Sequence, residues 1–373
     1  MSKIRADTLC VIASPDKSGR SNPARFLTYA RNKDCHAPAC QALAGRSLAM
    51  TGGVVDQADV IIGAKGPVNM DICEQLKNKF KEAVERNRAD GILLSGGLDT
   101  SILAFVARPS MGFTVALKGS LASDLVYSEK IAKLLGMQHK KVEFTTEEAL
   151  AILPEIIGIL KTFDLALPND LSIYFALKLA RKSGISSIMT GDGADELFAG
   201  YSYMTELPPK DLERYIRRLS QNWHFSANEL GKALGIEIKQ PFLDEDFIRF
   251  ALEISPELKV KDGVGKYILR KSFEDLIPAE IVWRKKEPIE YGSGSTKLHE
   301  VINSMVTDKE FQSARKEVDI KFINKEHLFY WRIYNQVVGK IPKARDDEIS
   351  CPCCGAGMGI YHCPTCGFSN PLL

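Results

Sequence analysis

The chain has 373 residues, 45% of them hydrophobic and 26% charged, and its formal net charge is +2. These values are typical of a globular protein with at least one sizeable core, and a charge so near neutral argues neither for nor against nucleic-acid binding. The longest apolar run, 151–160, contains Pro154 and is too short to span a bilayer. Acidic and polar residues come too early in the sequence for a signal peptide, so we expect a cytoplasmic protein.

Composition divides the chain into four segments. Residues 1–68 form a short, irregular segment, and residues 69–338 alternate strand-like with helix-like patterns. Residues 339–350 form a charged linker, and residues 351–373 hold a cysteine cluster. The alternation predicts a layered α/β domain followed by helices. We expect strands at 91–94, 113–117 and 187–190, and helices at 70–87, 125–135, 171–182 and 266–273.

The first expected strand runs into the glycine-rich loop SGGLDTS at 95–101, and a helix-like pattern follows. Paired glycines let the backbone approach a ligand, and the free N–H groups of a helix start favour an anion. Asp99 would repel that anion unless a cation lies between them. The loop therefore predicts a phosphate site with Mg²⁺, and the alternative is an ordinary strand-to-helix turn.

A second motif, SIMTGDGADELFAGYSY at 187–203, combines a short strand with an acidic turn. Asp192 and Asp195 are three residues apart and share a face if the turn is helical. Carboxylates at the carboxyl end of a strand in a doubly wound sheet usually point into the ligand crevice. The alternative is an acidic first helical turn, and we favour it for Glu196.

Together these two motifs resemble the asparagine synthetase family of the ATP pyrophosphatase superfamily. Three further segments resemble that family in the same order. They are FTVALKGS at 113–120, QPFLDEDF at 240–247, and GKYILRKSFEDLIPAEIVWRKKEP at 265–288. The resemblance covers residues 69–296 and implies an α/β fold with a doubly wound, mostly parallel sheet of the adenine nucleotide alpha-hydrolase type, followed by C-terminal helices.

The resemblance implies an ATP-dependent amide synthetase that releases AMP and pyrophosphate. A carboxylate, aspartate foremost, would be adenylated, and ammonia would then displace AMP. Asp99 and Asp195 would hold Mg²⁺, Asp192 would act in catalysis, and Lys266 would neutralise the α-phosphate unless it is a solvated surface lysine. The expected ATP-binding residues are Leu94, Ser95, Gly96, Gly97, Asp99, Thr100, Ser101, Val115, Thr190 and Gly191.

The sequence departs from the family pattern in two places. Asp192 stands where the family has glutamate, so we expect a backbone shift or a water to make up one missing methylene. The sequence begins Met1-Ser2, and residues 1–68 are too few for a full glutaminase domain with its N-terminal cysteine. We therefore expect ammonia to be free or to come from a separate glutaminase.

The nine cysteines include two close pairs in the tail, which is typical of a reducing compartment with metal-bound thiolates. Cys351, Cys354, Cys363 and Cys366 form two CxxC knuckles, the ligand pattern of a zinc ribbon. Cys353 and His362 are spare donors. Residues 351–373 contain no Lys or Arg, which favours a docking or lid module over a nucleic-acid reader. A second site at Cys35, His36 and Cys40 is disfavoured by its loose spacing.

Two other functions remain open. The cysteine tail would suit a tRNA-modifying ATP pyrophosphatase, which adenylates a base carbonyl. Asp192, where the family has glutamate, would suit a non-catalytic nucleotide-binding scaffold.

Overall fold

The computed structural model describes residues 11–15, 21–28, 70–221 and 223–369. The chain forms two compact units, Met1–Val60 and Ile61–Leu373. In the first unit, β1 (Val11–Pro15) pairs antiparallel with β2 (Ser21–Thr28). Cys35, His36 and Cys40 lie outside the described residues, so the second metal site stays untested.

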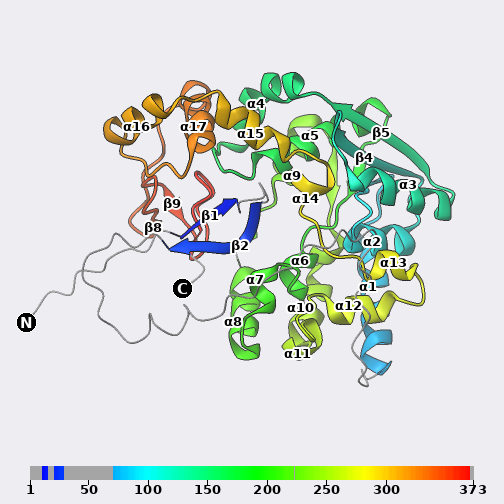
Figure 1. Ribbon diagram of the computed structural model, residues 1–373. Coiled ribbons are helices and arrows are strands. Elements are labelled where there is room, and N and C mark those ends of the chain that lie inside the picture. The colour runs from blue at the N-terminus through cyan, green and yellow to red at the C-terminus, as the bar shows by residue number, and fades with distance from the viewer. Residues whose placement is uncertain (1–10, 16–20, 29–69, 222, 370–373) are drawn as a thin grey trace, which may run out of the picture. The chain divides into compact units, whose positions relative to one another are not determined.

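The second unit is built on a five-stranded parallel sheet with the order β5-β4-β3-β6-β7 (Figure 1). Its strands are β3 (Gly91–Leu93), β4 (Met111–Leu117), β5 (Gln138–Phe144), β6 (Ser187–Met189) and β7 (Glu237–Lys239). The chain builds outward from β3 to β5 and then returns to the other side of β3 at β6. This reversal defines a doubly wound sheet, and the α/β fold predicted from the sequence is confirmed.

Helices cover both faces of the sheet because right-handed crossovers change face where the strand order reverses. The helices of this part are α1 (Met70–Arg86), α2 (Leu98–Ala107), α3 (Ser123–Leu135), α4 (Thr146–Leu160), α5 (Leu167–Lys182) and α9 (Ser226–Leu234). α2 and α3 connect β3 to β4 and β4 to β5, whereas α5 packs on β3, β4, β5 and α9. Pro154, which interrupts an apolar run of the sequence, lies inside α4.

The remaining helices follow β6 and β7. They are α6 (Ala194–Phe198), α7 (Ser202–Thr205), α8 (Pro209–Leu219), η2 (Pro241–Leu243), α10 (Glu245–Glu253), α11 (Pro256–Lys259), α12 (Tyr267–Phe273), α13 (Ala279–Val282), α14 (Ile289–Gly292), α15 (Lys297–Ser304), α16 (Asp308–Glu317) and α17 (Lys325–Val337). The helices expected at 70–87, 125–135, 171–182 and 266–273 are confirmed as α1, α3, α5 and α12, although α5 begins four residues earlier, at Leu167. Pro168 suits that start because the first turn of a helix needs no N–H from it.

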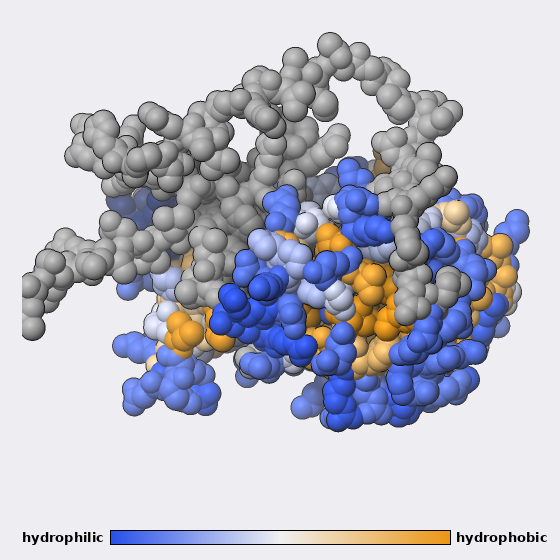
Figure 2. Space-filling view, turned by 90° about the horizontal axis from the view of Figure 1, so that it is seen from below, coloured by the Kyte–Doolittle hydropathy of each residue, from blue (hydrophilic) through white to orange (hydrophobic). Residues whose placement is uncertain are grey.

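An aromatic core holds α1 against η2 and α10. The ring of Phe80 lies 4.4 Å from that of Phe242 and 5.2 Å from that of Phe247, centroid to centroid. All three side chains are fully buried. Outside this core, most of the described surface on the face in Figure 2 is hydrophilic, with a hydrophobic area between the charged side chains. No helix among the described residues is both long and apolar enough to cross a membrane.

The tail folds as a small antiparallel pair, β8 (Ile349–Ser350) with β9 (Gly357–Met358). It lies beside α16 and α17 (Figure 1). β8 falls within the last two residues of the segment expected to be a linker, so the regular structure of the tail starts at Ile349.

Candidate active site and cysteine cluster

The glycine-rich loop joins β3 to α2 at the carboxyl edge of the sheet. Gly96 has a φ of +75°, and a Cβ there would lie 2.5 Å from the Cβ of Tyr127 and 2.7 Å from the nitrogen of Ser128. Only glycine fits this position, because its positive φ is unfavourable for other residues and a side chain would collide with the first turns of α3. The loop is therefore pressed against α3, with Gly96 buried and Gly97 half-buried.

Hydroxyl groups brace the same loop from inside. Ser95 Oγ lies 3.1 Å from Thr100 Oγ1 and accepts from the N–H of Gly97 at 3.2 Å. The Ser101 hydroxyl donates to the Gly97 carbonyl at 2.5 Å and is fully buried. In this structure Ser101 holds the loop together, and its contact with a phosphate stays a prediction.

The second motif meets the first across the point where the strand order reverses. Thr190 and Gly191 follow β6, and a Cβ on Gly191 would lie 3.1 Å from the Cβ of Asp99. The nitrogen of Thr190 donates to the carbonyl of Lys239 on β7 at 3.0 Å. The loops after β3, β6 and β7 therefore converge where doubly wound folds bind ligands.

A buried lysine joins the two motifs. Lys266 Nζ lies 2.5 Å from Asp99 Oδ2 and 2.7 Å from Asp195 Oδ1. The Lys266 side chain is 4% exposed, which rules out the solvated surface lysine. Lys286 also forms an ion pair with Asp195, and its ammonium lies 4.7 Å from the ring centre of Tyr201. Lys286 is a site residue that the sequence reasoning missed.

The backbone places Lys266 in an unusual conformation. Lys266 has a φ of +56° and is the N-cap residue of α12. Its N–H donates to the carbonyl of Phe198, the last residue of α6, at 2.8 Å. A left-handed residue other than glycine costs roughly 1–2 kcal/mol, and such strain clusters at functional sites. With this conformation, Lys266 lies beside Asp195 of α6 at the start of α12.

Opposing effects set the protonation of this cluster. Burial alone would lower the pKa of Lys266, but Asp195 and Asp99 outweigh it and raise the pKa of Lys266. Burial would raise the pKa of Asp195, but the charges of Lys266 and Lys286 hold it well below its usual range. Lys266 is therefore charged and Asp195 ionised at neutral pH.

The carboxylates of Asp99 and Asp195 fit a hard cation. Carboxylate oxygens are the ligands that Mg²⁺ prefers. Asp99 Oδ1 is buried and has no hydrogen-bond partner among the described residues, so it retains an unused acceptor. The carboxylates of Asp99 and Asp195 therefore fit Mg²⁺, and they share Lys266 as their counter-charge.

Two side chains hold the carboxylate of Asp192. Asp192 Oδ2 accepts from Thr190 Oγ1 at 2.6 Å and from Gln240 Nε2 at 2.8 Å. Burial raises the pKa of Asp192, and the nearby charges of Asp195 and Asp99 act in the same direction, against those two hydrogen bonds. The backbone shift or water that we expect to compensate for the short side chain stays a prediction, and Gln240 is a neighbour of Asp192 that the sequence reasoning missed.

The other expected residues have varied surroundings. Leu94 is buried at the end of β3, and Val115 lies on the neighbouring β4. Glu196 occupies the first turn of α6 as expected, but it also accepts from the Tyr201 hydroxyl at 2.6 Å, and burial raises its pKa to about 7. Asp244 of the PFLD turn caps α10 and is paired with Arg86, which is a structural role.

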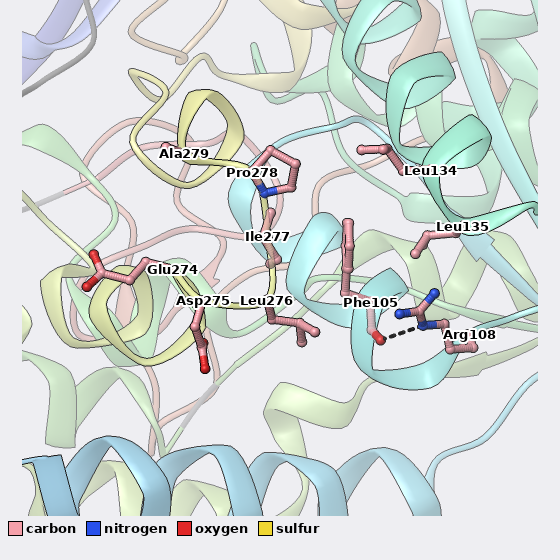
Figure 3. A pocket seen from close by; sticks show the side chains of 10 residues that line it. All are labelled: Phe105, Arg108, Leu134, Leu135, Glu274, Asp275, Leu276, Ile277, Pro278 and Ala279. Carbon is pink, nitrogen blue, oxygen red and sulfur yellow. Dashed lines mark hydrogen bonds between the residues drawn. The ribbon is translucent and has the colours of Figure 1, made fainter.

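A separate hollow lies at the far end of α2 from the loop. Phe105 and Arg108 at the end of α2 line it, together with Leu134 of α3 and Pro278 (Figure 3). None of the expected site residues is among its lining residues. The convergence of the loops at the carboxyl edge, rather than this hollow, is the candidate active site.

The four expected cysteines come together in the tail. Their sulfur atoms all lie within 4.8 Å of one another, with 3.6 Å between those of Cys351 and Cys366 and 3.7 Å between those of Cys354 and Cys363. Four thiolates at about 2.3 Å from a tetrahedral Zn²⁺ stand about 3.8 Å apart. The geometry therefore fits zinc. The spare donors are engaged elsewhere: Cys353 contacts the Lys321 carbonyl, and His362 contacts Ser369.

The doubly wound parallel sheet, with a glycine-rich loop at its carboxyl edge, defines the class of this α/β domain. Comparison with known proteins identifies its family. The asparagine synthase family matches residues 73–226 and 209–329. The glutamine-hydrolysing asparagine synthetase of Bos taurus is 33% identical over 281 residues, which are 68% of this chain and 50% of that protein. Asparagine synthetase B of Escherichia coli is 29% identical over 307 residues, 72% of this chain and 55% of that protein.

The chain belongs to the asparagine synthase family. It spans about half the length of the curated relatives that it matches. Among solved structures, the NMN synthetase of Francisella tularensis aligns over 75% of this chain and all of that one, at 16% identity and a TM-score of 0.34.

Proposed function

We propose that this protein is an ATP-dependent carbon–nitrogen ligase that forms AMP and pyrophosphate. A substrate carboxylate, aspartate foremost, attacks the α-phosphorus of ATP, the bond to pyrophosphate breaks, and ammonia then displaces AMP to give an amide. The observation that carries the proposal is the buried cluster of Lys266, Asp99 and Asp195 at the point where the strand order reverses.

Each group has a physical role in this proposal. The N–H groups of the loop, with the hydroxyls of Ser95 and Thr100, hold the pyrophosphate as its charge develops. Leu94, Val115, Thr190 and Gly191 line the nucleotide pocket. Mg²⁺, when bound by Asp99 and Asp195, supplies charge neutralisation at the phosphates.

Lys266 and Asp192 act at the reacting atoms. Lys266 would neutralise the α-phosphate with its ammonium, which pairs with Asp99 and Asp195 in this structure. The raised pKa of Asp192 suits a group that removes a proton from the incoming nitrogen nucleophile. Lys266 Nζ lies within 2.7 Å of both carboxylates, so its ammonium and a cation would compete for the same oxygens.

In the tail, we propose a structural Zn²⁺ held by Cys351, Cys354, Cys363 and Cys366. We further propose that the synthetase domain spans residues 69–338 and that the ribbon spans residues 351–373. The nitrogen donor is ammonia, either free or delivered by a separate glutaminase.

The test is an assay of AMP and pyrophosphate release by the purified chain with Mg-ATP, ammonium and a panel of acids that includes aspartate. We expect turnover with ammonium but not with glutamine, and loss of turnover in Asp99→Asn. Asp275→Asn is the matched control, because Asp275 also pairs with a lysine, Lys77 at 2.7 Å, but is 67% exposed and lies outside the site. Binding of Mg-ATP without pyrophosphate release for any acid would refute the ligase and favour a nucleotide-binding scaffold.

A further inference from the structure

We infer that Gln240 is a positioning residue that orients the Asp192 carboxylate for the proposed amide synthesis. The inference rests on the proposed function, and it concerns a residue that the family motifs do not assign. The amide of Gln240 donates to Asp192 Oδ2 at 2.8 Å, and Thr190 Oγ1 donates to the same oxygen at 2.6 Å. Both of these hydrogen bonds end on Oδ2. Among the described residues none is shown donating to Oδ1, so Oδ1 is the oxygen that remains for a substrate.

The fold fixes Gln240 from both sides. Gln240 follows β7 directly, and the β6–β7 register pairs Met189 with Lys239. On its other side, η2 begins at Pro241, and Phe242 is buried in the aromatic core. Because rigid elements hold both ends, the amide reaches Asp192 without a mobile loop. A site supported in this way is pre-organised.

The chemistry of the donor suits a carboxylate that must stay basic. The charged groups that act on the pKa of Asp192 are Asp195 on α6 and Asp99 on α2, and both raise it. The ammonium groups of Lys266 and Lys286 pair with Asp99 and Asp195, and neither forms an ion pair with Asp192. The neutral amide of Gln240 therefore orients the carboxylate without adding a positive charge that would weaken it as a base.

The contact also explains how an aspartate can serve at this position. The Asp192 side chain is one methylene shorter than the glutamate of the family motif, so a small rotation moves its free oxygen away from the substrate. Two donors on one oxygen prevent that rotation. Misplacement of a reacting group by 1 Å can cost about 100-fold in rate.

The first experiment compares Gln240→Val with the wild type in the pyrophosphate-release assay with Mg-ATP, ammonium and aspartate. We expect kcat to fall about 10- to 100-fold, as for a lost hydrogen bond to a charged group, with the KM for ATP within twofold. The acid limb of the pH–rate profile moves to higher pH, because losing a donor to the ionised form raises the pKa of Asp192. Gln240→Asn, which keeps the amide on a shorter side chain, loses less than Gln240→Val.

Gln75→Val is the matched control. The Gln75 amide also donates to an aspartate at 2.8 Å, but to exposed Asp71 on α1. We expect the kinetics of this variant to match the wild type. If Gln240→Val lowers kcat no more than Gln75→Val does, Gln240 does not position the carboxylate.

A second measurement separates this inference from the proposed function. The pKa of Asp192 can be followed by carbon-13 NMR of the labelled carboxylate in the full chain, assigned with Asp192→Asn, without any turnover. We expect a higher pKa in Gln240→Val, or in Gln240→Asn if the first variant does not fold. An unchanged pKa overturns the inference, whereas a shifted pKa in a chain that makes no pyrophosphate refutes only the proposed ligase.

Discussion

Replacing Lys266 with methionine tests whether its ammonium neutralises the same two carboxylates, Asp99 and Asp195, that we propose as Mg²⁺ ligands. Met has nearly the same length and apolar stem, but it leaves Asp99 and Asp195 without their shared cation. The side chains of Asp99 and Asp195 are only 18% and 20% exposed, so solvent screens their repulsion poorly. Breaking a buried ion pair from one side typically costs 3–5 kcal/mol.

The assay is thermal denaturation of the variant with and without Mg²⁺. At roughly 2–4 °C per kcal/mol for domains of 150–250 residues, that loss lowers Tm by on the order of 6 °C or more. Mg²⁺ then raises the Tm of Lys266→Met more than that of the wild type, because no ammonium competes for the two carboxylates. ATP-dependent pyrophosphate release is lost in either case.

Lys77→Met is the matched control for this change. Lys77 also bridges two carboxylates, Glu74 at 3.1 Å and Asp275 at 2.7 Å, but both are more than half exposed. Exposed pairs contribute about 0–1 kcal/mol, so its Tm stays close to that of the wild type. An unchanged Tm in Lys266→Met, or an equal Mg²⁺ response in both chains, would refute the idea that the ammonium and the metal exchange.

Two further predictions concern the tail and a buried acid. Elemental analysis is expected to find one zinc per chain, lost in Cys363→Ser but retained in Cys353→Ser, since Cys353 lies outside the cluster and contacts Lys321. Burial raises the pKa of Asp170 to about 7 against about 4 when unfolded, so the folded chain binds the extra proton and stability falls as pH rises from about 4 to 7. Asp170→Asn therefore raises Tm at pH 8 but not at pH 4, and an equal change at both values would contradict this.

The central strands and both site loops were predictable because local patterns specify them. An apolar strand followed by glycines, hydroxyls and an acid specifies the loop at 95–101 without any distant contact. Within the five-stranded sheet, the two strands that we did not predict, β5 and β7, are its two edges. The sequence of β5, QHKKVEF, is rich in charged residues. An edge strand is half solvated, and such charges discourage its pairing with other chains, so it lacks the apolar pattern of a central strand.

The missed site residues are those whose role depends on tertiary structure. Gln240 reaches Asp192, 48 positions away, only because β7 pairs with β6. Lys286 reaches Asp195 from a segment between α13 and α14 that has no periodic pattern. One signal was available for Gln240, since a residue that directly follows a strand in a doubly wound sheet lies at the ligand edge. That signal needs β7 to be recognised first.

The packing of the ribbon makes a last prediction about a chain that ends at Glu348. The Thr365 carbonyl accepts from the N–H of Phe163 at 2.9 Å and from the Thr162 hydroxyl at 3.2 Å, while the Cys353 carbonyl accepts from the N–H of Lys321 at 3.1 Å. Gly367 has a φ of +73° and packs so closely on Asp164 that a Cβ would lie 2.2 Å from its carboxylate. The ribbon is thus fitted to the turn after α4.

Removing the ribbon leaves those donors without acceptors. Each donor that stays buried lowers the free energy of unfolding by about 1–3 kcal/mol. We therefore expect the shortened chain to have a Tm several degrees lower. Its affinity for Mg-ATP, measured by calorimetry below that Tm, stays within about threefold, because none of these contacts involves the loops after β3, β6 or β7. A shortened chain with unchanged Tm and lost ATP binding would instead make the ribbon part of the nucleotide site.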